Sequence, residues 1–112
     1  MATSKEYLVF ILEQLSGLEG LSHRQMMGEH ILYYQGRIAA YLCDDRLLVK
    51  PVDAAKALLP DAVWEPPYDG AKDMLLVDNV YDPAFLCALF DAMLPQLPER
   101  RSALQGEAKG RK

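Results

Sequence analysis

Residues 30–50 read HILYYQGRIAAYLCDDRLLVK, and their pattern of apolar runs and turn residues predicts the centre of a β-sheet. Its three short apolar runs are separated by Gln35-Gly36 and Asp44-Asp45, pairs that can hold the positive φ of a tight hairpin turn. Together with the preceding run, Leu21–Met27, the spacing predicts an antiparallel meander of three or four strands. The alternation is imperfect in Arg37–Leu42, which is typical of a central strand covered on both faces.

A helix is predicted before the meander. Apolar side chains recur every three or four positions over about residues 4–16, which is the spacing of one helical face. Either Thr3 or Ser4 can cap this helix, and Thr3-x-x-Glu6 fits a capping box. Gly17 is a natural end, because glycine accepts the left-handed conformation beyond a helix.

The second half of the chain predicts a short helix, a lone strand and a long helix. Asp53 is expected to cap the short helix, and residues 60–73 are expected to be irregular because prolines and Gly70 interrupt them. Met74–Asp78 forms the strand, and Asp82-Pro83 opens the final helix. The fold class is therefore α+β: an antiparallel β-meander sheet flanked by N- and C-terminal helices, with a short middle helix.

The 112 residues suffice for one domain, which we expect at 1–97, followed by a basic, disordered tail at 98–112. Counting Lys and Arg against Asp and Glu gives the domain a net charge of −7 and the tail +3. An acidic body is repelled by DNA phosphate, so any nucleic-acid binding would be weak and would use the tail. Its candidate residues are Arg100, Arg101, Lys109, Arg111 and Lys112.

Catalytic and metal-binding patterns are missing from the sequence. No apolar run is long enough for a membrane span, and the first residues lack a signal-peptide layout. Cys43 and Cys87 lie in apolar runs without metal-ligand spacing, which favours reduced, buried thiols in a cytoplasmic protein, with a disulfide as the open alternative. We expect no cofactor, no metal and no catalytic residue.

The candidate binding surface follows from one loop and two cations. Residues 64–68 read WEPPY, a stiff apolar segment that loses little entropy on binding. Lys50 and Lys72 lie near strand ends, where an anion or an acidic partner can dock. The candidate partner-binding residues are therefore Trp64, Tyr68, Lys72 and Lys50. The alternatives are that the two aromatic side chains fold back over the sheet edge and that the lysines are solvated.

Four short strings, taken in this order and spacing, resemble the TfoX N-terminal domain family between about Ser4 and Leu94. Met27 and Leu48 depart from that pattern, since the family usually has Phe and Tyr there. The strings are Arg24-Gln25-Met26-Met27-Gly28, Ile31-Leu32-Tyr33-Tyr34-Gln35-Gly36-Arg37, Asp45-Arg46-Leu47-Leu48-Val49-Lys50 and Tyr68-Asp69-Gly70-Ala71-Lys72-Asp73-Met74.

The resemblance implies a non-enzymatic interaction module linked to transcription regulation. Full-length family members carry a second, helical domain and regulate natural competence in bacteria, acting with the cAMP receptor protein. We therefore expect a protein partner, such as the cAMP receptor protein or RNA polymerase, or a homodimer formed through a sheet edge. The fifteen residues that follow Leu97 are mostly polar, so we expect a single-domain member. The alternatives are nucleic-acid binding by the tail, and a small ligand-binding protein or enzyme.

Overall fold

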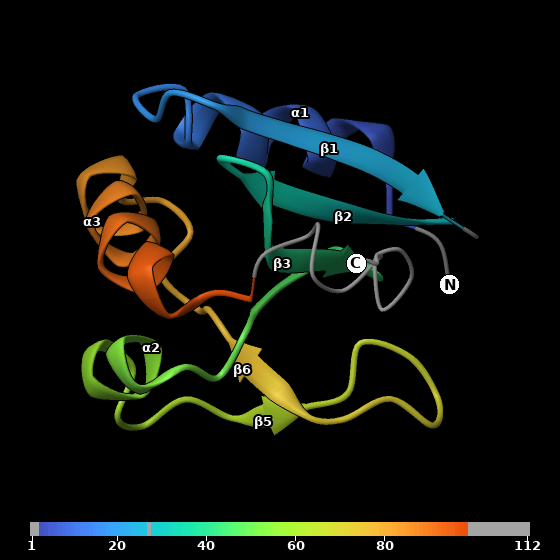
Figure 1. Ribbon diagram of the computed structural model, residues 1–112. Helices are drawn as coiled ribbons and strands as arrows, with labels where there is room; N and C mark the ends of the chain where they lie inside the picture. The colour runs from blue at the N-terminus through green and yellow to red at the C-terminus, as the bar shows by residue number, and fades with distance from the viewer. Residues whose placement is uncertain (1–2, 27, 99–112) are drawn as a thin grey trace, which may run out of the picture.

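The computed structural model describes residues 3–26 and 28–98. Its antiparallel sheet has the strand order β1-β2-β3-β4-β6-β5 (Figure 1), so the predicted α+β class with a meander sheet is confirmed. No helix of the described ranges is long and apolar enough to cross a membrane. The elements are α1 (Lys5–Gln14), β1 (Leu21–Met26), β2 (Glu29–Tyr34), β3 (Arg37–Cys43), β4 (Arg46–Val49), α2 (Asp53–Leu58), β5 (Trp64–Glu65), β6 (Met74–Leu76), α3 (Pro83–Met93) and the 3₁₀ helix η1 (Leu94–Gln96).

Both predicted hairpin turns are present. Gln35 and Gly36 have φ of 51° and 81°, and Asp44 and Asp45 have φ of 54° and 56°. Two successive positive φ angles give a turn whose twist matches that of the strands it joins. The turns therefore set the register of β2, β3 and β4 next to each turn, and the β2–β3 register shifts by one residue further along, between Leu32 and Tyr33.

After β4 the chain leaves the sheet, forms α2 and returns as β5 at the far edge. The strand β6 then fits between β4 and β5, with Leu75 opposite both Val49 and Trp64. The strand β5 lies in the stretch that we predicted to be irregular. Two residues followed directly by Pro66 and Pro67 show no strand pattern in the sequence. They form a strand because they pair with β6.

Side chains cap the two long helices. The Ser4 hydroxyl, not Thr3, accepts a hydrogen bond from the backbone N–H of Tyr7 at 3.1 Å. The Asp82 carboxylate accepts one from the backbone N–H of Phe85 at 3.1 Å, as predicted. These caps satisfy donors that have no partner within the helix.

The predicted cap of α2 is wrong. Asp53 is already the first residue of the helix, and its N-cap, Val52, makes no side-chain hydrogen bond. The Gln96 amide oxygen accepts from the backbone N–H of Ala54 at 2.8 Å instead. A residue distant in the sequence therefore satisfies this helix end, which no local pattern can reveal.

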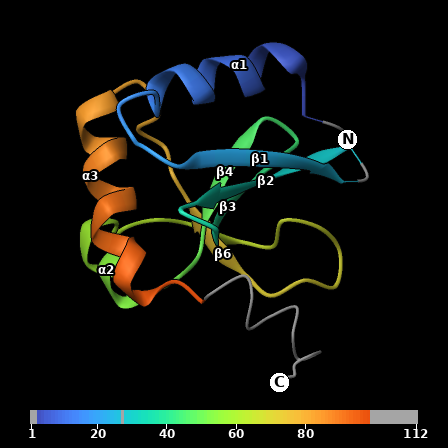
Figure 2. The ribbon, with the colours of Figure 1, turned by 45° about the horizontal axis from the view of Figure 1, so that its top comes forward.

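The central strands of the sheet, β2, β3 and β4, are largely buried on both faces. Figures 1 and 2 show α1 along β1 and β2, with α2 and α3 side by side at one end of the sheet. The main core includes Ile11, Leu15, Leu32, Leu42, Leu47, Leu75, Leu86 and Phe90. A second, smaller cluster lies on the opposite face and comprises Cys43, Leu48 and Met74 with Tyr41 and Leu76.

Polar contacts join the end of the central hairpin to the C-terminal helices. The Tyr34 hydroxyl, on a side chain only 4% exposed, donates to the Asp91 carboxylate. This hydrogen bond, together with burial, raises the pKa of Tyr34 to about 12. Arg37 Nη1 donates to the Leu94 carbonyl at 3.0 Å, at the start of η1. These contacts fix the position of α3 against β2 and β3.

We expect Tyr34→Phe to lower the free energy of unfolding by about 1 kcal/mol, because one hydrogen bond to a carboxylate is lost while the ring stays packed. Asp91 is exposed, so water can replace its partner. Urea denaturation followed by circular dichroism measures the effect. Tyr81→Phe is the matched control, since Tyr81 is 78% exposed. Equal stability of the two variants would contradict the assigned role of the hydrogen bond.

His30 is a buried histidine in β2. It is 8% exposed, and its Nδ1 has no hydrogen-bond partner in the described structure. The His23 ring on β1 lies beside it, with ring centroids 5.8 Å apart. Burial, and secondly the neighbouring His23, lower the pKa of His30 below 6.5. Folding therefore disfavours the protonated, charged form of this imidazole.

The wild-type protein should lose stability as the pH falls below about 6.5, because the unfolded chain then binds a proton at His30 that the folded chain does not. We expect His30→Leu to lose less stability than wild type between about pH 7.5 and about pH 5.5. Thermal unfolding at the two pH values measures the difference. His23→Gln is the control and should keep most of the wild-type slope, because burial is the larger cause. Parallel wild-type and His30→Leu profiles would contradict the prediction.

Candidate functional site

Two hollows lie beside the loop between β5 and β6, residues 66–73. This loop points away from α2 and α3 (Figure 1), and its Pro67 is buried. The first hollow has a volume of about 310 Å³, and we call it the lysine pocket. Tyr41, Lys50, Pro51, Pro67, Tyr68, Ala71, Lys72, Asp73 and Met74 line it.

Lys50 and Lys72 give this pocket its charge. Lys50 is half-buried, with its Nζ 5.9 Å from the centroid of the Tyr41 ring. Burial, followed by the charge of Lys72, lowers the pKa of Lys50. In the described ranges, neither ammonium group forms an ion pair with a carboxylate. The pocket therefore combines two cations that form no ion pair, one acidic residue, Asp73, and an aromatic wall.

Three of the four residues predicted for partner binding come together here. Lys50 ends one of the strings that carry the family resemblance, and Tyr68 and Lys72 belong to another. Tyr41 is a residue of the site that was not predicted from the sequence. Its position in β3, on the face opposite Leu42, was the available signal, because alternate residues of a strand share a face.

The fourth predicted residue, Trp64, lies elsewhere. It pairs with Leu75 in the sheet, whereas the pocket residue Met74 pairs with Glu65, so Trp64 and Met74 point to opposite faces. Trp64 is 49% exposed at the two-residue edge strand β5. Trp64 and the lysine pocket therefore do not form one surface.

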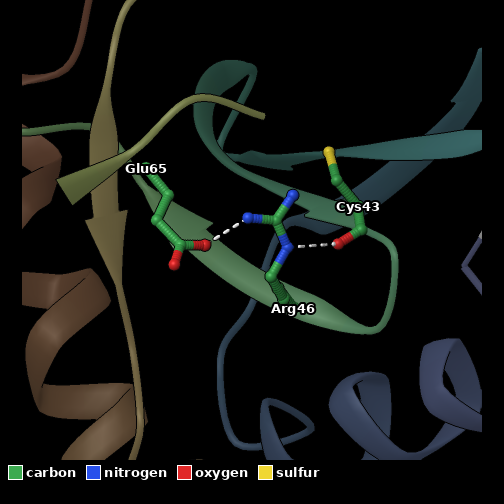
Figure 3. A network of polar contacts seen from close by, with 3 residues as sticks. All are labelled: Cys43, Arg46 and Glu65. Atoms are coloured by element: carbon green, nitrogen blue, oxygen red, sulfur yellow. Dashed lines mark hydrogen bonds and ion pairs between the residues drawn. The ribbon is translucent and has the colours of Figure 1, made fainter. Parts of the chain in front are cut away.

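The second hollow, of about 520 Å³, is acidic. Arg46 crosses it and forms an ion pair with Glu65, while its Nε donates to the Cys43 carbonyl at 3.2 Å (Figure 3). This contact ties β5 to the β3–β4 hairpin and neutralises the arginine. The acidic groups lining the hollow are Glu29, Asp44, Glu65 and Asp69.

Cys43 lies beside this acidic hollow. Burial, together with the neighbouring Glu29, raises the pKa of Cys43 to about 12. A protonated, buried thiol is a poor nucleophile and a poor metal ligand. Cys43 and Cys87 are both free, and the described ranges contain no group of three or more His, Cys, Asp or Glu arranged to hold a metal ion.

The strand β1 forms the longer edge of the sheet. Of its six residues, only Leu21 is partly buried, and the five that follow are exposed. Only β2 pairs with it in the described structure, so one side of its backbone is unpaired. The polar run Ser22–Gln25 was the sequence signal for an edge, because charged and polar side chains are typical of such strands.

The five basic residues predicted for nucleic-acid binding, Arg100, Arg101, Lys109, Arg111 and Lys112, lie outside the described residues. The boundary predicted at residue 97 falls directly after η1. Nucleic-acid binding by this segment therefore remains a prediction, and it is based on charge alone.

Comparison with known proteins identifies the family. The family model of the TfoX N-terminal domain matches residues 13–84, which include all six strands. An uncharacterized 12.7 kDa protein in the trpE 5′ region of Spirochaeta aurantia is 34% identical over 84 residues, covering 75% of this chain and 73% of that protein. No solved structure matches the chain. Since the family model covers well over half of the sequence, this protein belongs to the TfoX N-terminal domain family.

Proposed function

We propose that this domain is a non-enzymatic interaction module that binds an extended segment of a partner protein along the free edge of β1. The observation that carries this proposal is the edge itself, which offers six residues with an unpaired backbone side. An extended partner segment can add a strand there, with backbone hydrogen bonds supplying affinity. The edge at β5 is only two residues long and offers far fewer backbone groups to a partner strand.

The hydrogen-bond pattern identifies the backbone groups available to a partner. The Gln35 N–H donates to the Gly20 carbonyl at 2.8 Å, so the pair Gly20–Gln35 is hydrogen-bonded. Hydrogen-bonded and non-hydrogen-bonded pairs alternate along an antiparallel ladder. The N–H and C=O groups of His23 and Gln25 therefore point away from β2, toward an added strand.

A second copy of the chain fits this edge. If two β1 strands pair in antiparallel fashion about His23, then Arg24 of one copy faces Ser22 of the other. The two arginines do not oppose each other, and like charges directly opposite would be unfavourable. This pairing would join the two sheets into one continuous sheet.

We further propose a link to bacterial transcription regulation. Family membership supports this role and suggests the cAMP receptor protein or RNA polymerase as a partner.

We expect Gln25→Pro to weaken strand addition at least about tenfold, because proline removes an outward-facing N–H and obstructs the added strand. Gln25→Ala is the matched control and should bind as wild type does. Sedimentation velocity measures self-association, and biolayer interferometry measures binding to purified cAMP receptor protein and RNA polymerase.

Circular dichroism establishes that both variants are folded, as expected for an edge position. If wild type binds none of the three partners, or if Gln25→Pro binds like Gln25→Ala, the edge is not the interaction site.

A further inference from the structure

We propose that the lysine pocket binds a small organic anion, namely a carboxylate or phosphate group carried on a compact apolar body. The site differs from the β1 edge and does not depend on strand addition. Its volume of about 310 Å³ lies at the lower end of the ~300–1,000 Å³ found for ligand sites. A compact ligand therefore suits it better than a large one.

The two pocket lysines are distinguished by sharing one pocket, since Lys5 and Arg24 also form no ion pair with another described residue. Residues 3–98 contain fourteen acidic and seven basic side chains, so carboxylates are abundant. Arg46 is paired with Glu65, and Lys56 with Asp53. Lys50 and Lys72, in contrast, line one pocket and have no carboxylate partner in the described structure, although Asp73 lines the same pocket. A bound anion would supply the missing charge.

Burial of Lys50 also favours a bound anion. A half-buried ammonium group has lost part of its hydration, and a second ammonium nearby adds repulsion. Both effects lower the pKa of Lys50 in the free protein. An anion between the two lysines would offset the lost hydration and screen the repulsion, so binding should raise the pKa of Lys50.

The remaining walls suit an apolar ligand body. The ring of Tyr41 lies beneath Lys50, and Pro67 and Met74 are buried residues of the pocket lining. Tyr68 is 47% exposed and lines the lysine pocket as well as the acidic hollow. The acidic hollow keeps a negative excess, because only Glu65 of its four acidic residues is paired with Arg46, so the lysine pocket is the more favourable position for an anion.

The test uses the full chain at low ionic strength and four probes: benzoate, phenyl phosphate, neutral benzamide and inorganic phosphate. Titrations are followed by ¹H–¹⁵N chemical shifts, which locate the binding site. We expect saturable shifts at Tyr41, Lys50 and Tyr68 with benzoate or phenyl phosphate, and the two affinities decide between a carboxylate and a phosphate. Benzamide cannot form a charged hydrogen bond, and inorganic phosphate has no apolar body. Each should therefore bind at least about tenfold more weakly.

Charge-removing variants complete the test. Lys50→Gln and Lys72→Gln should each weaken binding of the better probe about tenfold or more, while Lys56→Gln should leave it unchanged. Lys72 is exposed, so its replacement tests the proposal even if Lys50→Gln fails to fold.

Three results would overturn the proposal: no saturable binding of either aromatic anion, equal binding of benzamide, or equal loss of binding in all three lysine variants. Equal affinity for inorganic phosphate and phenyl phosphate would overturn the inference that the ligand carries an apolar body.

Discussion

Burial of the central hairpins on both faces determines how the helices and loops are arranged around the sheet. Leu47, Leu48 and Val49 of β4 are consecutive and fully buried, although neighbouring residues of a strand point to opposite faces. Leu47 and Val49 pack in the main core with the helices, and Leu48 packs with Cys43 on the other side. Both faces of the sheet therefore need a cover.

The two covers differ in kind, and this difference locates the pockets. Helices carry continuous apolar faces and fill the first side with a packed core. On the second side, the loop 66–73 supplies Pro67 and Tyr68 beside the cluster of Cys43, Leu48 and Met74. A short loop rich in proline cannot fill that surface as a helix would. Hollows remain beside it, and charged side chains reach into them from the strand ends.

Local signals in the sequence predicted most of the fold. The turns at Gln35-Gly36 and Asp44-Asp45 require particular backbone angles, and the cap at Asp82 acts within one helical turn, so each could be predicted from neighbouring residues. The strand β5 and the cap of α2 by Gln96 depend on partners distant in the sequence. No periodicity records such contacts, which explains why both were missed.

The candidate site shows the same division. Lys50, Tyr68 and Lys72 were identified by residue type and by their position near strand ends, but only the fold shows that they share a pocket. Trp64 was grouped with Tyr68 because both are aromatic residues of the stiff segment WEPPY, yet Trp64 lies in a strand whose alternation places it on the other face. Two prolines lie between them, and of residues 64–68 only Pro67 and Tyr68 line the lysine pocket. Pairing of β5 with β6 therefore decides which aromatic residue of this segment faces the pocket, and sequence alone does not show that pairing.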